Sequence, residues 1–425
     1  MSRVLVQHGV WSCAVGMVAL VLGSGGGPAG AEEHWPQFRG PHANGTSTAK
    51  GLPTHWSETQ NIRWKTPLHD RGWSSPVVWG DQIWVTAAPE DGKASYAICV
   101  HKETGRILYD IKLWDVEKPS PLGNALNGYA SCTPVIEEGR VYVHFGSYGT
   151  ACIDTTSGKV LWQRRDLPCE HFRGPGSSPI LFENLLIFHM DGYDYHYIVA
   201  LDKQTGQTVW KVDRNIDYGT TNGDFMKAFS TPIVIEAAGK TQLISPSSKA
   251  TISYDPRTGR EYWRVRYTSH SGAAMPLFGH GLVYLNTGFG KADLMAVRPD
   301  GEGDVTATHV VWTAKKSIGS KPSQLLVGDL IFNVHDAGVA SCLSAHTGEE
   351  LWSRRLSGNY SASPLYADGK VYFWSEDGTT TVVRAAPQYE EIARNQLEDG
   401  FMASPAVIGK ALIVRTRSAL YRIEE

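Results

Sequence analysis

The residues best suited to chemistry in this chain include the stretch HMDGYDYHYIV at 189–199, which holds two histidines and two aspartates. Imidazole and carboxylate groups are metal ligands, but this spacing matches no standard zinc site. His144 and His189 occupy equivalent places, ten residues after a strand-opening proline. We interpret them as histidines satisfied at strand ends, with a ligand-binding pair as the alternative. The sequence contains neither a G-x-S-x-G nucleophile motif nor a phosphate-binding P-loop.

A second set of candidates consists of aromatic and basic side chains in eight short segments, each of which leads into a short apolar run. They are Arg71, Trp73, Tyr129, Arg173, Lys227, His270, Lys321, Tyr360 and Phe401. The Arg and Lys residues are permanent cations. If they converge on one channel mouth, they favour an anionic ligand or an acidic loop of a partner. The alternative is that local carboxylates hold these cations at the rim.

One phrase recurs along the chain and identifies the elements that must position these residues. It reads CIDTTSGKVLW at 152–162, ALDKQTGQTVW at 200–210, SYDPRTGREYW at 253–263 and CLSAHTGEELW at 342–352, with a worn copy, CVHKETGRILY, at 99–109. The Asp accepts a backbone hydrogen bond, and the Gly supplies the positive φ that closes a hairpin. The run after the Gly predicts a strand. We expect the tryptophans to pack between repeats, namely Trp162, Trp210, Trp263, Trp312 and Trp352.

A second phrase precedes each turn, and its copies set the number of repeats. Each copy has a short strand opened in most cases by Pro, a turn and a second alternating strand. The copies begin at residues 73, 131, 176, 229, 273, 321, 361 and 402. With the turn phrase, each repeat has four strands, which predicts an all-β, eight-bladed β-propeller of four-stranded antiparallel blades.

The ends of the chain are expected to close the ring. The last unit lacks an outer strand, and NIRWKTPL at 61–68 supplies it, which removes the open sheet edge. Seven blades are the alternative, because the seventh unit has Ala393 in place of the tryptophan.

Composition narrows the class of protein. The chain of 425 residues is 42% hydrophobic, which suffices for a large core, and its net charge of −3 gives no electrostatic case for nucleic-acid binding. Arg3, an apolar stretch over 10–22 and the small residues at 29–31 predict a signal peptide over 1–31, cleaved after Ala31. An uncleaved anchor is the alternative. We expect a periplasmic or secreted monomer with no membrane span after cleavage.

Cysteines in this sequence indicate packing. Cys99, Cys152 and Cys342 share one slot, six residues before the turn glycine, where other repeats have Ala or Ser. A position that holds a small residue in every copy of the phrase indicates packing and not redox or metal chemistry. Cys132 and Cys169 fall outside the slot, and a disulfide between them stays open.

The chain divides into the signal segment, an N-terminal extension over 32–60 and the propeller over 61–425. Trp35 and Phe38, in the extension's WPQFRGP, are costly to leave in water. We expect them to pack across the outer face or base of the propeller. A partner-docking motif is the alternative.

The phrase ALDKQTGQTVW in an eight-fold array resembles the pyrroloquinoline-quinone (PQQ) repeat, and HWPQFRGPHANGTS at 34–47 is similar to the opening of exported bacterial PQQ-binding-like propellers. The resemblance covers residues 32–425. This repeat builds the quinoprotein alcohol dehydrogenases and also non-catalytic relatives, such as the propeller lipoprotein of the outer-membrane barrel-assembly machinery. The resemblance implies the fold and is weak for cofactor binding, because the phrase forms structural turns.

Several features of the quinoprotein dehydrogenases have no match in this sequence. It has no adjacent Cys-Cys pair and no C-x-x-C-H, and Asp191, Asp194, Asp224 and Asp399 fall in no motif that matches a Ca²⁺ site. We therefore expect a non-catalytic, exported propeller that binds a protein partner or a small anionic ligand in the envelope, without a cofactor. The alternative is a PQQ-dependent oxidoreductase of alcohols or sugars, with Ca²⁺ and a divergent site.

Overall fold

The computed structural model describes residues 1–2, 34–123 and 125–425, so the predicted signal peptide and its cleavage after Ala31 lie outside the described residues. Over 34–425, apart from residue 124, the regular structure is β-strand with one short 3₁₀ helix, η1 (Gly223–Phe225). The alternating and β-branched runs that follow each turn account for the predominance of strands, because such residues suit a pleated sheet.

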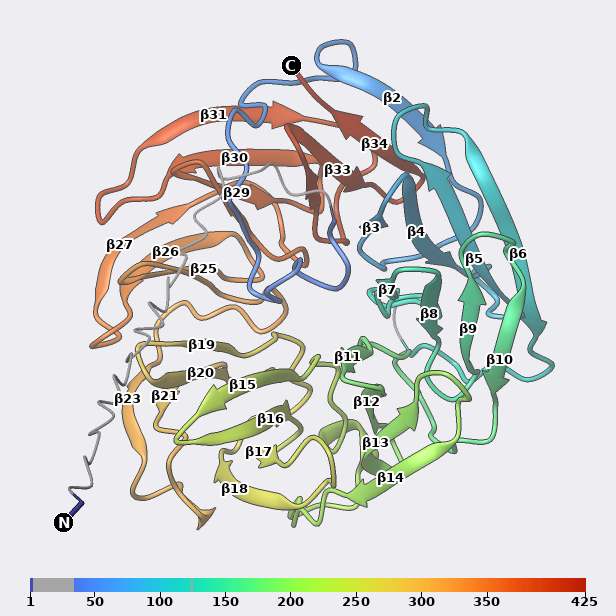
Figure 1. Cartoon of the computed structure of the whole chain (residues 1–425). Helices are drawn as coiled ribbons and strands as arrows, with labels where there is room; N and C mark the ends of the chain where they lie inside the picture. Colours follow the sequence, from blue (N-terminus) through green and yellow to red (C-terminus); the bar gives the residue numbers. More distant parts are fainter. Residues whose placement is uncertain (3–33, 124) are drawn as a thin grey trace. The chain divides into compact units, whose positions relative to one another are not determined.

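Eight sheets follow one another round a ring in chain order, from blue to red in Figure 1, and each contains four antiparallel strands. Blade 1 consists of β3 (Val77–Trp79), β4 (Gln82–Ala87), β5 (Ala94–His101) and β6 (Ile107–Asp115), and blade 2 of β7 (Val135–Glu137), β8 (Arg140–His144), β9 (Thr150–Asp154) and β10 (Val160–Arg164). Blade 3 consists of β11 (Ile180–Phe182), β12 (Leu185–Asp191), β13 (His196–Asp202) and β14 (Thr208–Asp213), and blade 4 of β15 (Ile233–Ala237), β16 (Lys240–Pro246), β17 (Ala250–Tyr254) and β18 (Glu261–Arg266). Blade 5 consists of β19 (Leu277–Gly279), β20 (Leu282–Asn286), β21 (Leu294–Val297) and β23 (Val310–Ala314), and blade 6 of β24 (Leu325–Val327), β25 (Leu330–Val334), β26 (Val339–Ser344) and β27 (Glu350–Arg355). Blade 7 consists of β28 (Leu365–Ala367), β29 (Lys370–Trp374), β30 (Thr379–Arg384) and β31 (Glu391–Gln396), and blade 8 of β32 (Ala406–Ile408), β33 (Ala411–Arg415), β34 (Ala419–Ile423) and β2 (Ile62–Pro67). Two short strands add parallel edges, β1 (Thr46–Ser47) on β28 and β22 (Gly303–Asp304) on β18. The first strand of each blade lies nearest the axis and the fourth lies outermost (Figure 1).

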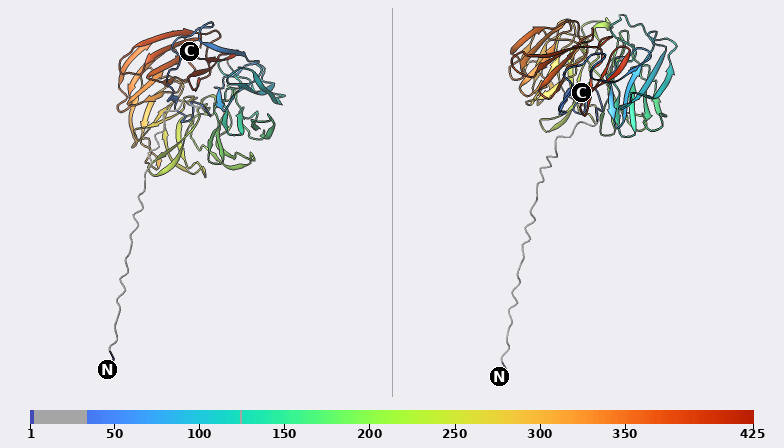
Figure 2. Two further views of the ribbon diagram at one scale, coloured as in Figure 1. Left: turned by 45° about the horizontal axis from the view of Figure 1, so that its top comes forward. Right: turned by 90° about the horizontal axis from the view of Figure 1, so that it is seen from above.

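The predicted closure of the ring is confirmed. Strand β2 pairs antiparallel with β34, with Trp64 opposite Arg422, and the two strands lie side by side in every view (Figure 2). The alternative of seven blades is wrong. Ala393 stands opposite Val382 in an ordinary fourth strand, in the register that places Trp210 opposite Ala200 in blade 3. The sheet tolerates the loss of one tryptophan because its strand pairing is intact.

The turn phrase behaves as its chemistry predicts. Asp202 Oδ1 accepts hydrogen bonds from the N–H groups of Gln204 and Thr205, at 3.0 and 2.8 Å, and Gly206 has a φ of 73°. A Cβ on Gly206 would lie 2.7 Å from the ring of Trp162, so the indole of one blade rests on the turn of the next. The indole also donates to the carbonyl of Lys203 at 3.0 Å.

The same indole-to-turn bond joins four other pairs of blades and confirms the predicted role of the tryptophans. The donors and carbonyl acceptors are Trp64 and Lys102, Trp210 and Pro256, Trp312 and Ala345, and Trp352 and Ala386. Trp263 is fully buried between blades 4 and 5, but it donates to Gln242 of its own blade. Blade 5 has no copy of the turn phrase, so that indole finds another acceptor.

All five described cysteines outside the masked N-terminal segment are buried free thiols. Cys99, Cys152 and Cys342 lie opposite the aromatic residue of the fourth strand, as the packing interpretation predicts. Cys132 and Cys169 form no disulfide.

The described part of the N-terminal extension crosses the ring near its axis. Trp35 pairs with Val78 of blade 1 and is fully buried, and Arg39 donates to the carbonyl of Gln324 in blade 6 at 2.6 Å. Strand β1 then reaches blade 7, and Figure 1 shows the blue segment passing between these blades. The alternative of a partner-docking motif at Trp35 is therefore wrong, because the indole is buried against the propeller itself.

Candidate binding funnel

A belt of hydroxyl groups builds the wall of the central channel. The residue two positions before the first strand of each blade is Ser or Thr in seven blades and Met in the other; in chain order these are Ser75, Thr133, Ser178, Thr231, Met275, Ser323, Ser363 and Ser404. Each Ser or Thr oxygen accepts the N–H of the equivalent residue in the preceding blade, at 2.9–3.0 Å. We call this set the hydroxyl belt. It interlocks the blades and keeps the wall narrow and polar.

Above the hydroxyl belt the eight predicted segments meet round one cavity of about 510 Å³. Every segment contributes to its lining, through Trp73, Ser131, Arg173, Asp224, His270, Lys321, Ser361 and Met402, among others. Phe38 of the N-terminal extension also lines it. We call this cavity the funnel. Pockets of this size in proteins hold small molecules or a few side chains of a partner.

Four of the nine residues predicted for the mouth line the funnel, namely Trp73, Arg173, His270 and Lys321. The other five lie beside or beneath it. Arg71 stacks on the ring of Trp73, 4.6 Å from its centroid, and donates to the carbonyl of Ala125. Burial lowers the pKa of Arg71, although Glu90 opposes this effect. Its role is to hold the Trp73 ring and the neighbouring loop in place.

The remaining aromatic candidates are buried and support the loops from below. Tyr129 donates to the carbonyl of Ser120 at 2.9 Å. Phe401 packs edge-on against Trp374, with centroids 5.3 Å apart, and Tyr360 is fully buried. These three side chains determine the positions of loop backbones and do not reach the funnel.

Carboxylates hold the permanent cations that line the funnel. Arg173 makes two bonds of 2.7 Å to the carboxylate of Asp224, and Lys321 donates to Glu376 at 2.9 Å. The hydrogen bond from Arg173 lowers the pKa of Asp224. The funnel wall thus carries paired charges, as in the alternative that local carboxylates hold the cations.

Lys227, unlike Arg173 and Lys321, forms no ion pair with an acid within the described residues. Its side chain is fully buried, and across the described chain its Nζ has no hydrogen-bond partner. The ammonium lies 5.1 Å from the centroid of Phe229 and 5.8 Å from that of Phe172. Burial lowers its pKa to about 7, although Asp224 opposes this effect. Lys227 therefore exchanges its proton close to neutral pH.

Large apolar side chains stand exposed at the mouth. Phe289 is 58% exposed, Leu126 44% and Phe225 41%. We call these three residues the apolar rim. His270 lies between the two phenylalanines, with centroid distances of 4.8 and 5.8 Å, and burial lowers its pKa. Three exposed apolar side chains round one opening are a feature of contact surfaces.

The polar stretch 189–199 is structural. His189 Nδ1 lies 2.8 Å from Asp191, and Asp191 forms a doubly hydrogen-bonded, fully buried pair with Arg214. Burial lowers the pKa of His189, so the ring is neutral at neutral pH. His144 lies 2.8 Å from the hydroxyl of Thr150. Both histidines make their Nδ1 contacts within their own sheets, whereas the buried Nε2 of His189 has no hydrogen-bond partner among the described residues.

Sequence reasoning missed four parts of the funnel. It expected Phe38 on the outer face or base of the propeller but did not predict that Phe38 lines the funnel from its floor, and it did not find the partners Asp224 and Glu376. It also passed over the hydroxyl belt, although a Ser or Thr before the strand in seven of eight copies was a readable signal. No signal in the sequence predicted the apolar rim, because exposed residues in variable loops follow no repeat.

Three comparisons with known proteins agree with this architecture. Methanol dehydrogenase [cytochrome c] subunit 1 of Methylobacterium organophilum is 29% identical over 168 residues, which are 34% of this chain, and the chain spans only 24% of that relative. The solved structure of BamB from Moraxella catarrhalis superimposes with a TM-score of 0.58 at 13% identity, covering 85% of this chain and 99% of that one. The quinohemoprotein alcohol dehydrogenase of Comamonas testosteroni gives 0.67 at 12% identity, covering 93% and 81%. At these identities the two structures show a shared fold.

Within the described residues no helix is long and apolar enough to cross a membrane. A family model described as outer membrane protein assembly factor BamB matches residues 57–196, 194–304 and 302–388. Because these matches cover more than half of the chain and the fold is an eight-bladed ring, the protein belongs to this family of PQQ-repeat propellers.

Proposed function

We propose that this protein is a non-catalytic binding propeller of the bacterial envelope, which holds an apolar segment of a protein partner at the mouth of its funnel. The observation that carries the proposal is the apolar rim. Phe289 exposes 58% of its surface beside the mouth, and burying such a side chain contributes about 2 kcal/mol to a contact. A partner that covers all three rim residues would gain a stable anchor.

The charges of the funnel favour an apolar partner over an anion. Arg173 and Lys321 already face Asp224 and Glu376, so an anionic ligand would have to compete with these carboxylates. His270 is uncharged at neutral pH because burial lowers its pKa. What the mouth offers is aromatic surface with hydroxyl and amide groups below it, which suits a side chain with its adjoining backbone.

The floor of the funnel supports insertion from one side. Phe38 lines the cavity from the N-terminal extension, which is anchored to blade 1 through Trp35 and to blade 6 through Arg39. A partner segment can therefore enter from the mouth and stop at Phe38. The family description names an assembly factor, which is consistent with a protein as the partner.

Site-specific photo-crosslinking in the native host tests this proposal. A benzophenone amino acid replaces Phe289 at the rim or, as the control, Val209 on the outer strand β14, which is 51% exposed. We expect a discrete crosslinked protein from position 289 that is absent from position 209. A second substitution, Phe225→Ser, should weaken that product. Equal products from both positions, or none from 289, would contradict the proposal.

A second candidate function is a PQQ-dependent oxidoreductase, and the sequence similarity to methanol dehydrogenase favours it. The donor groups of the funnel do not fit a quinone held with Ca²⁺, which needs six to eight oxygen ligands. Asp224 and Asp336 are the carboxylates that line the funnel within the described chain. Asp224 is committed to Arg173, and Asp336 accepts the N–H groups of Ser320 and Lys321. We derive no reaction step through the quinone.

A further inference from the structure

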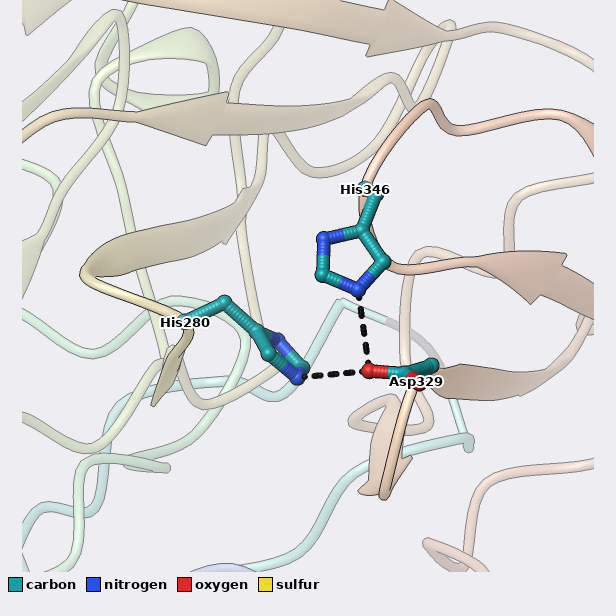
Figure 3. Close-up of side chains that lie close together, drawn as sticks. All are labelled: His280, Asp329 and His346. Carbon is teal, nitrogen blue, oxygen red and sulfur yellow. Dashed lines mark hydrogen bonds and ion pairs between the residues drawn. The ribbon is translucent and has the colours of Figure 1, made fainter.

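Two histidines and one aspartate converge on the face of the ring opposite the funnel mouth. His280 follows β19 in blade 5, Asp329 follows Gly328 in the β24–β25 turn of blade 6, and His346 lies in the turn phrase of that blade. The Nε2 atoms of His280 and His346 lie 3.2 and 2.9 Å from the same oxygen of Asp329 (Figure 3). The three ligand atoms lie within 4.8 Å of one another, and all three residues are exposed.

One equivalent junction of the ring holds an ion pair. Glu183 follows β11 as His280 follows β19, and both residues adopt the same left-handed turn conformation, with φ of 53° and 54°. Glu183 bonds to Arg257, which occupies the same place in its turn phrase as His346. Blades 3 and 4 are thus joined by an acid and a base. Blades 5 and 6 instead place two imidazoles next to each other, with ring centroids 4.7 Å apart and ring planes inclined by 56°.

The junction between blades 5 and 6 therefore lacks the charge complementarity of its counterpart. Two imidazoles share one oxygen of a single carboxylate. A cation between the three groups would satisfy both rings and the carboxylate at once. Figure 3 shows the rings directed at Asp329 from two different turns.

The orientation of His280 is fixed by a group behind it. Its Nδ1 lies 3.0 Å from the hydroxyl of Tyr284, a residue that is 1% exposed. An imidazole that donates through Nδ1 presents the lone pair of Nε2 to a metal, and such outer contacts orient metal-binding histidines. Tyr284 is thus a positioning residue for Nε2 of His280.

We propose that His280, Asp329 and His346 bind one divalent transition-metal ion, of which Zn²⁺ is the representative, and that this ion links blades 5 and 6. Two imidazoles and one carboxylate are borderline ligands that suit Zn²⁺ and not Ca²⁺. Tetrahedral zinc with bonds of about 2.1 Å separates its ligand atoms by about 3.4 Å. The two observed separations of 3.2 and 2.9 Å need only a small expansion. Water takes the fourth position, because the site is exposed. This site is independent of the funnel and of its proposed function.

Competition between the protein and a chelating indicator dye for Zn²⁺ tests the site. The purified chain carries no oligohistidine tag, and the variants are His280→Asn, which tolerates the left-handed turn, and His346→Gln. We expect the parent to bind one equivalent of Zn²⁺ and each variant to bind it at least about tenfold more weakly. Tyr284→Phe should also weaken binding, by about tenfold or more, while it keeps all three ligands. Zn²⁺ should raise the melting temperature of the parent and leave that of His346→Gln unchanged.

The matched control is His309→Gln. His309 belongs to the same blade and lies 3.5 Å from Asp300, but it is a single histidine with a single acid. Its loss should leave Zn²⁺ binding unchanged, and excess Ca²⁺ should not displace the metal. If the parent binds no Zn²⁺ at micromolar concentration, or if His280→Asn and His346→Gln bind it as the parent does, the site does not exist.

Discussion

The backbone N–H of Ser404 donates to Oγ of Ser75 at 3.0 Å and so joins the last blade of the ring to the first. The two residues lie far apart in the chain, and the bond continues the hydroxyl belt across the junction. Arg415 reinforces the same junction, since its guanidinium donates to the carbonyl of Thr86 at 2.9 Å. The closure of the propeller therefore rests on polar contacts at the axis as well as on strand pairing at its edge.

Removal of one acceptor from the hydroxyl belt should destabilise the ring. Ser404→Ala would alter the link from Ser363, whose N–H loses its buried acceptor. An unsatisfied buried N–H costs about 1–3 kcal/mol, and we expect the free energy of unfolding in urea to fall by that amount. Ser404→Thr keeps the oxygen and serves as the control, since Thr occupies the same place in two other blades. Equal stability of the Ala and Thr variants would contradict the role of the belt.

The indole-to-turn bond between blades should also be measurable. Trp210 is 8% exposed, and its Nε1 donates to the carbonyl of Pro256 at 3.0 Å. Trp210→Phe removes that donor. We expect it to lower the free energy of unfolding by about 1–3 kcal/mol more than the same substitution does at a tryptophan that has no such bond. Trp114 is the matched case, because within the described residues its buried Nε1 has no acceptor. If Trp114→Phe lowers the free energy of unfolding as much as Trp210→Phe, the bond contributes nothing.

Lys227 predicts a specific dependence of stability on pH. Burial lowers its pKa to about 7 in the folded protein, whereas an unfolded lysine titrates near 10.4. Between these values the unfolded chain binds more protons, so Lys227 makes stability rise with pH, by at most about 1.4 kcal/mol per pH unit. Below pH 7 both states are protonated and the penalty for a buried charge is constant.

Lys227→Met isolates this effect, because it keeps the apolar stem and removes the charge. The variant should be more stable than the parent at pH 6, and the difference should shrink from pH 7 towards pH 10. Urea unfolding of both proteins over this range provides the measurement. A difference that stays constant with pH would show that Lys227 keeps its charge in the folded state.

The fold was predictable because its determinants are local and repeated. Asp202, Gly206 and Trp162 lie within or next to one phrase, so the phrase predicts the turn, the strand and the packing together. The pairing of β2 with β34 followed from counting strands, since an unpaired edge is costly. Ala393 shows the limit of such patterns, because the blade persists without its tryptophan.

The contents of the funnel were less predictable because they depend on contacts between loops. Tyr129 and Tyr360 have the residue type and the loop position expected of an aromatic that binds a ligand, yet their side chains are buried beneath the loops and do not line the funnel. Arg173 meets Asp224 from the next blade, 51 residues away, and no local pattern announces that pair. Phe38 reaches the floor from a segment that belongs to no repeat. The junction of His280 and His346 likewise appears only when two turns are placed side by side.

The central claim, that this propeller binds a partner without a quinone cofactor, is tested most directly by titrating the purified chain with PQQ in the presence and absence of Ca²⁺. Tryptophan fluorescence reports binding, because Trp73 lines the funnel. We predict no saturable change in fluorescence at micromolar PQQ, with or without Ca²⁺. Saturable quenching that requires Ca²⁺ would contradict the claim and assign the funnel to a quinoprotein oxidoreductase.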